Sequence, residues 1–436
     1  MLKRKAYQKF AEWKNTKTKQ GLLVAGARQV GKTYLIREFA KENYANFAEI
    51  NLLGNELAIN AFKEATNASE LMARISILSN VELVPGETLV FLDEVQEYKE
   101  IVTAIKFLVE QNDYDFVLSG SLLGVELKNI RSVPVGYLDT VILYPLDFEE
   151  YCQAKNLPAF ALEAARAAFD ACTPVPDYIH DRLLSLFYEY LIVGGMPAAV
   201  SAFLETNNLL TVRRIQANLI LQNKQDISKY NEADALIIKE IYDLIPSELN
   251  NQNKRFILKD MKTNARYGRY EECFIWLADA GVALPVFNAD APMYPLLLSK
   301  ASNLFKLFMA DVGLLTSTFI KDTSIEILNK NPNVNYGSIF ENAVAQELKS
   351  QKFELYYYRS KKFGELDFVV ETPGGTVIPI EVKSGKNYKR HNALRNVLAR
   401  GDYSISKGYV LSEANVEADG DVTYLPIYMT MYLSLL

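Results

Sequence analysis

An eight-residue segment near the start of the chain has the residue types and the spacing needed to bind a nucleoside triphosphate. Residues 26–33 read GARQVGKT and fit the pattern G-x-x-x-x-G-K-[ST]. The glycines let backbone N–H groups close around phosphate oxygens, and the N-terminus of a following helix adds its positive dipole. We expect Lys32 to reach the β- and γ-phosphates of ATP and the Thr33 hydroxyl to bind Mg²⁺. The predicted nucleotide contacts in this segment are Gly26, Ala27, Arg28, Gln29, Val30, Gly31, Lys32, Thr33 and Tyr34.

Two later apolar segments end in polar residues that fit the same site. Residues 88–92 are followed by Asp93 and Glu94, and residues 116–118 are followed by Ser119. We expect Asp93 to hold Mg²⁺, Glu94 to polarise the attacking water, and Ser119 to face the γ-phosphate. An Asp-Glu pair after a strand is commonplace by itself. All three features in this order favour ATP hydrolysis over a chance match.

A Gly-Gly-Met-Pro turn at residues 194–197 has two readings. It is either a simple helix break, since Gly and Pro punctuate helices, or a lid turn that packs on the nucleotide through Gly195 and Pro197. The arginine that stabilises the transition state is not evident. Arg131 is one candidate acting in trans, which would require a homo-oligomer, and a solvated surface arginine is the simpler interpretation.

Near the C-terminus, a second set of residues has the pattern of a metal-dependent nuclease. Asp367 is followed by Glu381 and Lys383, which share one face of a strand because they are two residues apart. A hairpin would bring Asp367 beside Glu381, and Glu341 could approach from a preceding helix. Such carboxylates can hold Mg²⁺ or Mn²⁺, and Lys383 can stabilise charge on a phosphate. The alternative is a solvated hairpin face with an ordinary Glu–Lys pair.

The elements that must position these residues fall into several blocks. Apolar strands at residues 21–25, 88–92, 116–118 and 141–143 alternate with helices such as 32–43, which predicts a parallel sheet covered on both faces. From about residue 148 the pattern is helical, as at 159–171, 183–190, 199–227 and 233–246. The last hundred residues read as a helix at 339–349, strands at 355–358, 365–371 and 377–382, and a basic helix.

The middle of the chain has the order of a winged helix-turn-helix. Helical pieces at residues 258–263 and 270–280 precede an apolar strand at 282–286. Basic residues gather there and again after Ser384, so both segments could contact nucleic acid or, alternatively, an acidic protein. They are Lys254, Arg255, Lys259, Lys262, Arg266 and Arg269, then Lys386, Lys389, Arg390, Arg395 and Arg400.

Composition limits the classes of protein that fit. The 436 residues are about half hydrophobic and carry a net charge of −6, so nucleic acid could be bound only by a local basic surface. The three widely spaced cysteines argue against structural zinc and disulfides. No secretory signal and no membrane-length apolar stretch is evident, so we expect a cytoplasmic protein.

Taken together, the chain resembles the bacterial and archaeal AAA+ ATPases that carry a C-terminal domain of unknown function with a restriction-endonuclease-like fold. The matching segments are GARQVGKT, FLDEVQ, LSGS, YPLDFEEY, YLIVGGMP, FKLFMADVGLL and GSIFENAVAQEL…GELDFVV…IEVKSG. The resemblance implies ATP binding at Lys32, Thr33, Asp93 and Glu94, and a Gly195-x-Pro197 turn that senses nucleotide. Where relatives would have Gly-Arg, this chain has Gly136-Tyr137, which weakens an arginine-finger assignment there.

The predicted fold is therefore an α/β P-loop NTPase core (residues 1–147), a helical lid (148–235), a winged-helix segment (236–330) and an α/β restriction-endonuclease-like domain (331–436). The leading functional hypothesis is an ATP-driven switch or motor acting on nucleic acid, DNA in particular. The alternative is a slow ATPase that serves as a regulatory scaffold, with a C-terminal domain that binds a partner without cleaving it.

Overall fold

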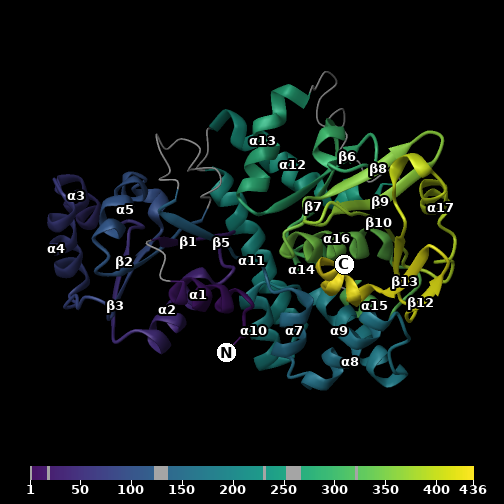
Figure 1. Ribbon diagram of the computed structural model, residues 1–436, viewed down its shortest axis with the longest axis horizontal. Helices are drawn as coiled ribbons and strands as arrows, with labels where there is room; N and C mark the ends of the chain where they lie inside the picture. The colour runs from purple at the N-terminus through teal and green to yellow at the C-terminus, as the bar shows by residue number, and fades with distance from the viewer. Residues whose placement is uncertain (1, 17–19, 122–135, 229–231, 252–266, 320–322) are drawn as a thin grey trace. The chain divides into compact units, whose positions relative to one another are not determined.

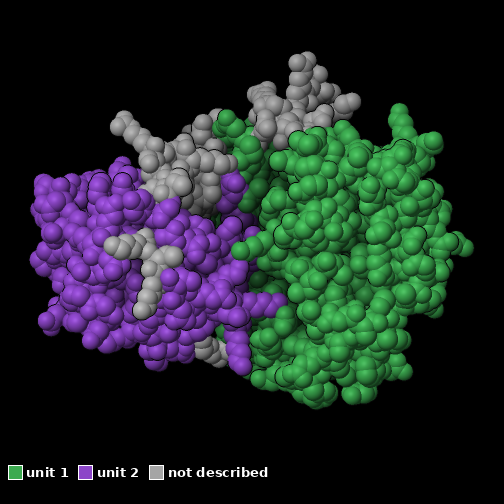
Figure 2. All heavy atoms as spheres, viewed as in Figure 1, with its two compact units in different colours: residues 1–2, 145–278, 282–436 green, residues 3–144, 279–281 purple. Residues whose placement is uncertain are grey.

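The computed structural model describes residues 2–16, 20–121, 136–228, 232–251, 267–319 and 323–436. These residues form two compact units, coloured purple and green in Figure 2. The N-terminal unit comprises residues 3–144 together with Asp279–Gly281. The C-terminal unit comprises residues 145–278 and 282–436, with the first two residues of the chain.

The N-terminal unit is built on one five-stranded parallel sheet with the strand order β2-β3-β4-β1-β5. Its strands are β1 (Gly21–Ala25), β2 (Asn46–Asn51), β3 (Thr88–Asp93), β4 (Asp115–Ser119) and β5 (Leu138–Ile142). Its helices are α1 (Ala6–Asn15), α2 (Lys32–Asn43), α3 (Glu56–Glu64), α4 (Ala68–Ser79), the 3₁₀ turn η1 (Val95–Glu97) and α5 (Glu100–Gln111).

Both faces of this sheet are buried, because successive strand residues point to opposite sides. In β1, Leu22 and Val24 pack with α1 and α2, whereas Leu23 packs in the core that contains α3, α4 and α5. In Figure 1, α1 and α2 lie on one side of these strands and α3, α4 and α5 on the other. The predicted parallel sheet covered on both faces is confirmed, and the predicted strand 21–25 and helix 32–43 match β1 and α2.

The C-terminal unit begins with helices and continues into a sheet. The helices up to the sheet are α7 (Phe148–Ala154), α8 (Ala159–Ala171), α9 (Asp177–Val193), α10 (Pro197–Thr206), α11 (Leu209–Ser228), α12 (Glu232–Asn250) and α13 (Tyr267–Asp279). The later ones are η4 (Leu296–Ser299), α14 (Val312–Ser317), α15 (Thr323–Leu328), α16 (Tyr336–Ser350), α17 (Asn392–Leu398), η5 (Gly401–Tyr403) and η6 (Ile427–Leu435).

The sheet of this unit has eight strands in the order β12-β13-β11-β10-β9-β8-β6-β7. They are β6 (Ala283–Ala289), β7 (Lys300–Met309), β8 (Tyr356–Ser360), β9 (Gly364–Glu371), β10 (Val377–Val382), β11 (Gly408–Ser412), β12 (Glu417–Asp419) and β13 (Val422–Pro426). The pair β6–β7 is an antiparallel hairpin, and β6 continues the sheet through parallel pairing with β8.

Two helices cover opposite faces of this sheet. Leu366 in β9 packs with Ala393 and Leu394 of α17. The next residue, Asp367, points to the other face, where α16 contacts β6, β7 and β10. Figure 1 shows α16 close to β10, and α17 at the right-hand side of the same unit.

The division of the chain differs from the segments predicted from the sequence. The first predicted boundary, at residue 147, lies three residues from the end of the N-terminal unit at Tyr144. Apart from Asp279–Gly281, the predicted lid, winged-helix and nuclease-like segments fall in one compact unit, in which the β6–β7 hairpin shares a sheet with β8–β13. The predicted helix at residues 258–263 lies outside the described residues.

Within the described part of the chain, no single helix is long and apolar enough to span a membrane. Only α9 and α10 together, bent by 118° at the break between them, pass that test of length and composition.

Candidate functional site

The loop between β1 and α2 has a backbone that only glycine tolerates at its first position. Gly26 has φ +143°, and a Cβ there would lie 2.2 Å from the carbonyl oxygen of Leu143. Gly31, at φ +93°, is the left-handed residue from which α2 starts at Lys32. The two glycines therefore let the loop turn tightly onto the N-terminus of α2, which is the geometry that a phosphate-binding loop needs.

The Lys32 side chain is folded back into this loop. It is only 6% exposed, and its Nζ donates to the carbonyl oxygens of Gly26 (3.0 Å) and Ala27 (2.8 Å). Burial lowers the pKa of Lys32 to about 8, and the nearby charges of Glu94 and Asp93 oppose that shift. The ammonium group is therefore still charged at neutral pH and stands at the centre of the loop, as binding of phosphate oxygens requires.

Asp93, at the end of β3, accepts hydrogen bonds from three other residues of the site. Its Oδ2 accepts a hydrogen bond from Thr33 Oγ1 (3.0 Å), and its Oδ1 accepts from the Ser119 hydroxyl and from the backbone N–H of Glu94 (3.0 Å). Burial raises the pKa of the Asp93 carboxyl, while the hydrogen bonds from Ser119 and Thr33 act in the opposite direction. The structure thus brings together Thr33, Asp93, Glu94 and Ser119, as the sequence predicts.

The order of the strands explains this convergence. Strand β4 lies between β1 and β3, and the three run parallel. Their carboxyl ends therefore meet at one edge, where ligands bind in such sheets. The Thr33 hydroxyl and the Asp93 carboxylate lie side by side and are oxygen ligands of the kind Mg²⁺ prefers, so these residues fit a nucleotide-bound Mg²⁺.

Glu94 is held in a fixed orientation next to this centre. It adopts a left-handed backbone conformation with φ +56°. Its Oε2 accepts hydrogen bonds from Gln96 Nε2 and from Ser121 Oγ (3.2 Å), and Ser121 in turn accepts one from Arg28 Nε (3.3 Å). A carboxylate positioned in this way can accept a proton from an attacking water.

We expect Glu94→Gln to lower ATP hydrolysis by about 10²-fold while nucleotide binding stays close to normal, because the amide keeps the shape of the side chain but accepts no proton. Single-turnover hydrolysis and equilibrium binding of a fluorescent ATP analogue, measured on the same preparation, test this. Unchanged single-turnover hydrolysis would contradict the role given to Glu94.

Two residues of this site were missed by sequence reasoning. Asn51, at the end of β2, donates from Nδ2 to Asp93 Oδ2 (3.3 Å). Arg4, just before α1, donates from Nη1 to the carbonyl oxygen of Val30 in the loop (2.9 Å) and from Nη2 to that of Tyr144 (2.5 Å). Asn51 could have been predicted, because it is a polar residue at the end of a further strand. Nothing in the sequence indicates that Arg4 contacts the P-loop.

The remaining predicted nucleotide contacts are placed differently. Tyr34 is 53% exposed at the start of α2. Gly195 and Pro197 belong to the C-terminal unit, and Arg131 lies outside the described residues. Tyr137, at the position where an arginine finger would be expected, donates its hydroxyl to Glu110 Oε1 (2.8 Å).

In the C-terminal unit, the Gly-Gly turn is locked into a buried polar cluster. The Gly195 N–H donates to Asp311 Oδ2 (2.6 Å), and the Gly195 carbonyl accepts from the Leu146 N–H (2.7 Å). Gln346 Nε2 also reaches Asp311 Oδ2, at 3.4 Å. Burial raises the pKa of Asp311 to about 6, opposed by the hydrogen bonds from Gly195 and Leu314. Four of the segments that carry the sequence resemblance therefore contact one another here through Leu146, Gly195, Asp311 and Gln346.

The predicted ligands Asp367 and Glu381 lie on adjacent strands, β9 and β10, of the C-terminal sheet. Asp367 Oδ2 accepts the backbone N–H of Val382 (2.8 Å), and Glu381 Oε2 accepts from Lys383 Nζ (2.8 Å). Burial, with the Asp367 charge added, raises the pKa of Glu381 to about 8. The pKa of Lys383 is also raised, because Glu381 and Asp367 outweigh the effect of its burial.

A residue that the sequence did not single out stands among these carboxylates. Lys306 of β7 is 1% exposed, and its Nζ lies 3.0 Å from Glu365, 3.6 Å from Glu341 and 4.0 Å from Asp367. Burial lowers its pKa, but the charges of Glu341, Asp367 and Glu365 outweigh this and raise it.

The predicted metal ligands of the C-terminal unit do not converge as a metal-binding group. Among the described residues, no set of three or more His, Cys, Asp or Glu side chains is arranged to hold a metal ion. Glu341, Asp367 and Glu381 were expected to form such a set. The structure instead places the Lys306 ammonium against Glu341 and Asp367 and the Lys383 ammonium against Glu381.

The basic residues after Ser384 are largely paired with acids. Lys389 contacts Glu417 (2.6 Å) and Arg395 contacts Asp419 (3.3 Å), so the acidic strand β12 faces part of the basic segment. Arg400 also contacts Asp402. Because these pairs are exposed, they contribute little and can exchange partners.

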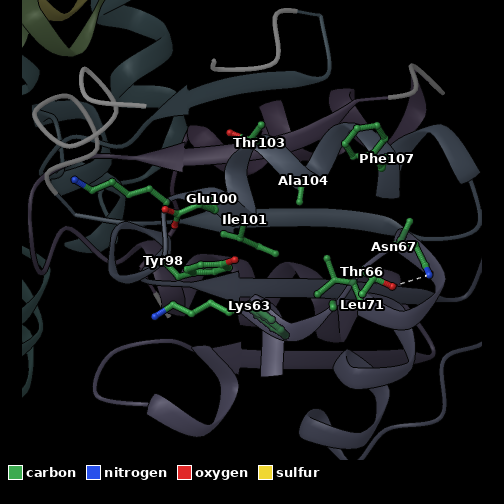
Figure 3. Close-up of a pocket in the computed structure, with 14 residues that line it drawn as sticks. Lys63, Thr66, Asn67, Leu71, Tyr98, Glu100, Ile101, Thr103, Ala104 and Phe107 are labelled. Atoms are coloured by element: carbon green, nitrogen blue, oxygen red, sulfur yellow. Dashed lines mark hydrogen bonds between the residues drawn. The ribbon is translucent and has the colours of Figure 1, made fainter. Parts of the chain in front are cut away.

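A separate hollow of about 970 Å³ lies on the N-terminal unit, between the α3–α4 turn and the start of α5. In Figure 3, Lys63 and Tyr98 lie toward one end of it, and Thr66, Asn67 and Phe107 toward the other. Its wall includes residues just after η1, but none of the P-loop residues and not Asp93. It is therefore distinct from the nucleotide site.

Comparisons with known proteins agree with this geometry for the first third of the chain. Residues 18–152 match the model of an AAA domain, whereas residues 184–324 and 336–429 match two domains of unknown function, DUF8612 and DUF4143. No curated protein matches the chain.

Several solved structures are similar in part. The Walker-type ATPase of Pyrococcus abyssi is 15% identical, with 73% of this chain and 96% of that chain covered and a TM-score of 0.45. AMPPCP-bound DnaA from Aquifex aeolicus is 12% identical, with 57% and 73% covered and a TM-score of 0.30. Because both TM-scores are below 0.5, these similarities say nothing about what this chain binds. The AAA match and the Asp93-centred geometry agree, and residues 18–152 form an AAA-family ATPase domain.

Proposed function

We propose that this chain is an ATP-hydrolysing switch or motor that acts on nucleic acid, DNA in particular. One observation carries the ATPase part: Asp93 joins the P-loop threonine, Ser119 and the backbone of Glu94 in one hydrogen-bonded centre. A centre with a charged lysine, a Mg²⁺-binding pair and a fixed carboxylate has the groups needed to position and hydrolyse a γ-phosphate.

The nucleic-acid part rests on the basic segments of the sequence. The exposed partners of Lys389 and Arg395 are weak ones, so phosphate groups can displace Glu417 and Asp419. The helix α13 followed by the β6–β7 hairpin also supports a winged-helix element, whose preceding basic residues lie outside the described part of the chain. An acidic protein partner is the competing reading of the same segments.

Salt dependence separates these two partners. If the basic segments bind phosphates, DNA binding releases counterions. The logarithm of the affinity for duplex DNA should then fall steeply and linearly with the logarithm of the salt concentration. The ATPase rate should also change when DNA is added. No measurable DNA binding at low salt, or an affinity that does not respond to salt, would rule out DNA in favour of a protein partner.

We also propose that residues 331–436 have a restriction-endonuclease-like fold. The order α16, three antiparallel strands β8–β10, α17 and β11 supports it, with Asp367 and Glu381 on adjacent strands. Such a domain can bind without cutting. The position of Lys306 favours a C-terminal domain that binds its partner without cleaving it.

A plasmid assay tests cleavage directly. With Mg²⁺ or Mn²⁺ present, we expect the wild-type chain to nick supercoiled plasmid no faster than Asp367→Ala and Lys383→Ala. Nicking by the wild type that disappears in both variants would establish a nuclease and overturn the non-cleaving reading. Equal nicking in all three proteins would point to a contaminant.

A further inference from the structure

The buried amine of Lys306 is the least expected group in the C-terminal unit. Its Nζ lies within 4.0 Å of three carboxylates, Glu341, Glu365 and Asp367. It also stands 5.1 Å from the centre of the Tyr357 ring. A buried ammonium needs compensating charge and hydrogen bonds, and this one has both.

Lys306 contacts two of the carboxylates that were predicted to bind a divalent cation. Glu341 and Asp367 are two of the three carboxylates that the nuclease-like pattern assigns to a metal ion, and both face the Lys306 ammonium. A Mg²⁺ ion bound by these two groups would need their oxygens at roughly 2.1 Å. Such an ion would compete with the Lys306 ammonium for the same two carboxylates and would be repelled by its like charge.

The third predicted ligand is also engaged. Glu381 accepts a hydrogen bond from Lys383 Nζ (2.8 Å), and the second oxygen of Asp367 accepts the Val382 N–H (2.8 Å). At the edge of the cluster, Arg359 approaches Glu365 at 3.9 Å. Each of these carboxylates thus has a cation or a backbone N–H of the chain itself within 4.0 Å, and a divalent ion would have to displace these contacts.

We propose that Lys306 is a built-in cation that takes the place of the divalent metal in this cluster. The C-terminal unit then binds neither Mg²⁺ nor Mn²⁺ at Asp367 and Glu381. The Lys306 side chain holds α16, β7 and β9 together through charge, as a structural metal would. The inference concerns only the C-terminal unit and holds whether or not the chain hydrolyses ATP or binds DNA.

Counting bound Mn²⁺ by electron paramagnetic resonance tests this proposal on the full chain without nucleotide. The wild type and Asp367→Asn are compared under identical conditions, so that any ion held near Asp93 is present in both and cancels. We expect the two proteins to bind the same number of Mn²⁺ ions. One ion fewer in Asp367→Asn would overturn the proposal.

The complementary experiment removes the internal cation. Lys306→Met is expected to gain one Mn²⁺ ion per chain, and the double variant Lys306→Met/Asp367→Asn is expected to lose it again. Lys306→Arg, which keeps the charge, should gain none. A folded Lys306→Met that binds no additional ion would show that Lys306 does not occupy a metal position. If circular dichroism shows Lys306→Met to be unfolded, the wild-type and Asp367→Asn comparison still decides the question.

Discussion

Lys32→Ala is expected to lower steady-state ATP turnover at least ~10³-fold, because the buried ammonium group of the P-loop is lost. The Lys32 Nζ is bonded to the carbonyl oxygens of Gly26 and Ala27, within the loop that would surround the phosphates. Phosphate release measured over a range of ATP concentrations tests the expectation.

Lys41→Ala is the matched control, since Lys41 is an exposed lysine in the same helix α2. It changes net charge and helix composition as Lys32→Ala does, and its turnover should stay within about twofold of the wild type, as expected for a surface substitution. If turnover also survives in Lys32→Ala, the assignment of residues 26–33 as the phosphate-binding loop is wrong.

The nucleotide site could be predicted from the sequence because its main groups follow local rules. The P-loop pattern fixes a turn between a strand and a helix, and Asp93 and Ser119 each end an apolar strand. Parallel strands put such ends at one edge, so the meeting of Asp93 with Thr33 and Ser119 follows from strand order alone.

Contacts between distant segments were not predictable in the same way. Lys306 lies in a strand 61 residues before Asp367, and its sequence neighbours Phe305 and Leu307 suggest only an apolar strand. Nothing in that pattern indicates that β7 ends the sheet next to α16. The pairing of β6 with β8 joins the predicted winged-helix hairpin to the C-terminal strands. It could not be predicted either, because the sequence does not show which strands are neighbours. A pattern of alternation specifies a strand, not its neighbour.

Gly195→Ala is expected to destabilise the C-terminal unit by about 3 kcal/mol, because the new methyl group would overlap main-chain atoms that cannot move aside. An ideal Cβ at Gly195 would lie 2.0 Å from the carbonyl oxygen of Leu146. Relieving that overlap breaks the hydrogen bond from the Leu146 N–H, at 2.7 Å, or the one to Asp311, at 2.6 Å. Either break leaves a buried polar group without its partner.

Gly401→Ala is the control for the glycine substitution itself, since a Cβ at Gly401 meets nothing within 4 Å. Denaturant unfolding of both variants, alongside equilibrium binding of an ATP analogue, separates the two roles open to Gly195. The packing role predicts a lower unfolding free energy for Gly195→Ala at every nucleotide concentration, with Gly401→Ala unchanged. If Gly195→Ala is instead as stable as Gly401→Ala but binds nucleotide more weakly, the Gly195-Met-Pro197 turn acts on the nucleotide, as the sequence resemblance implies, and the packing argument fails.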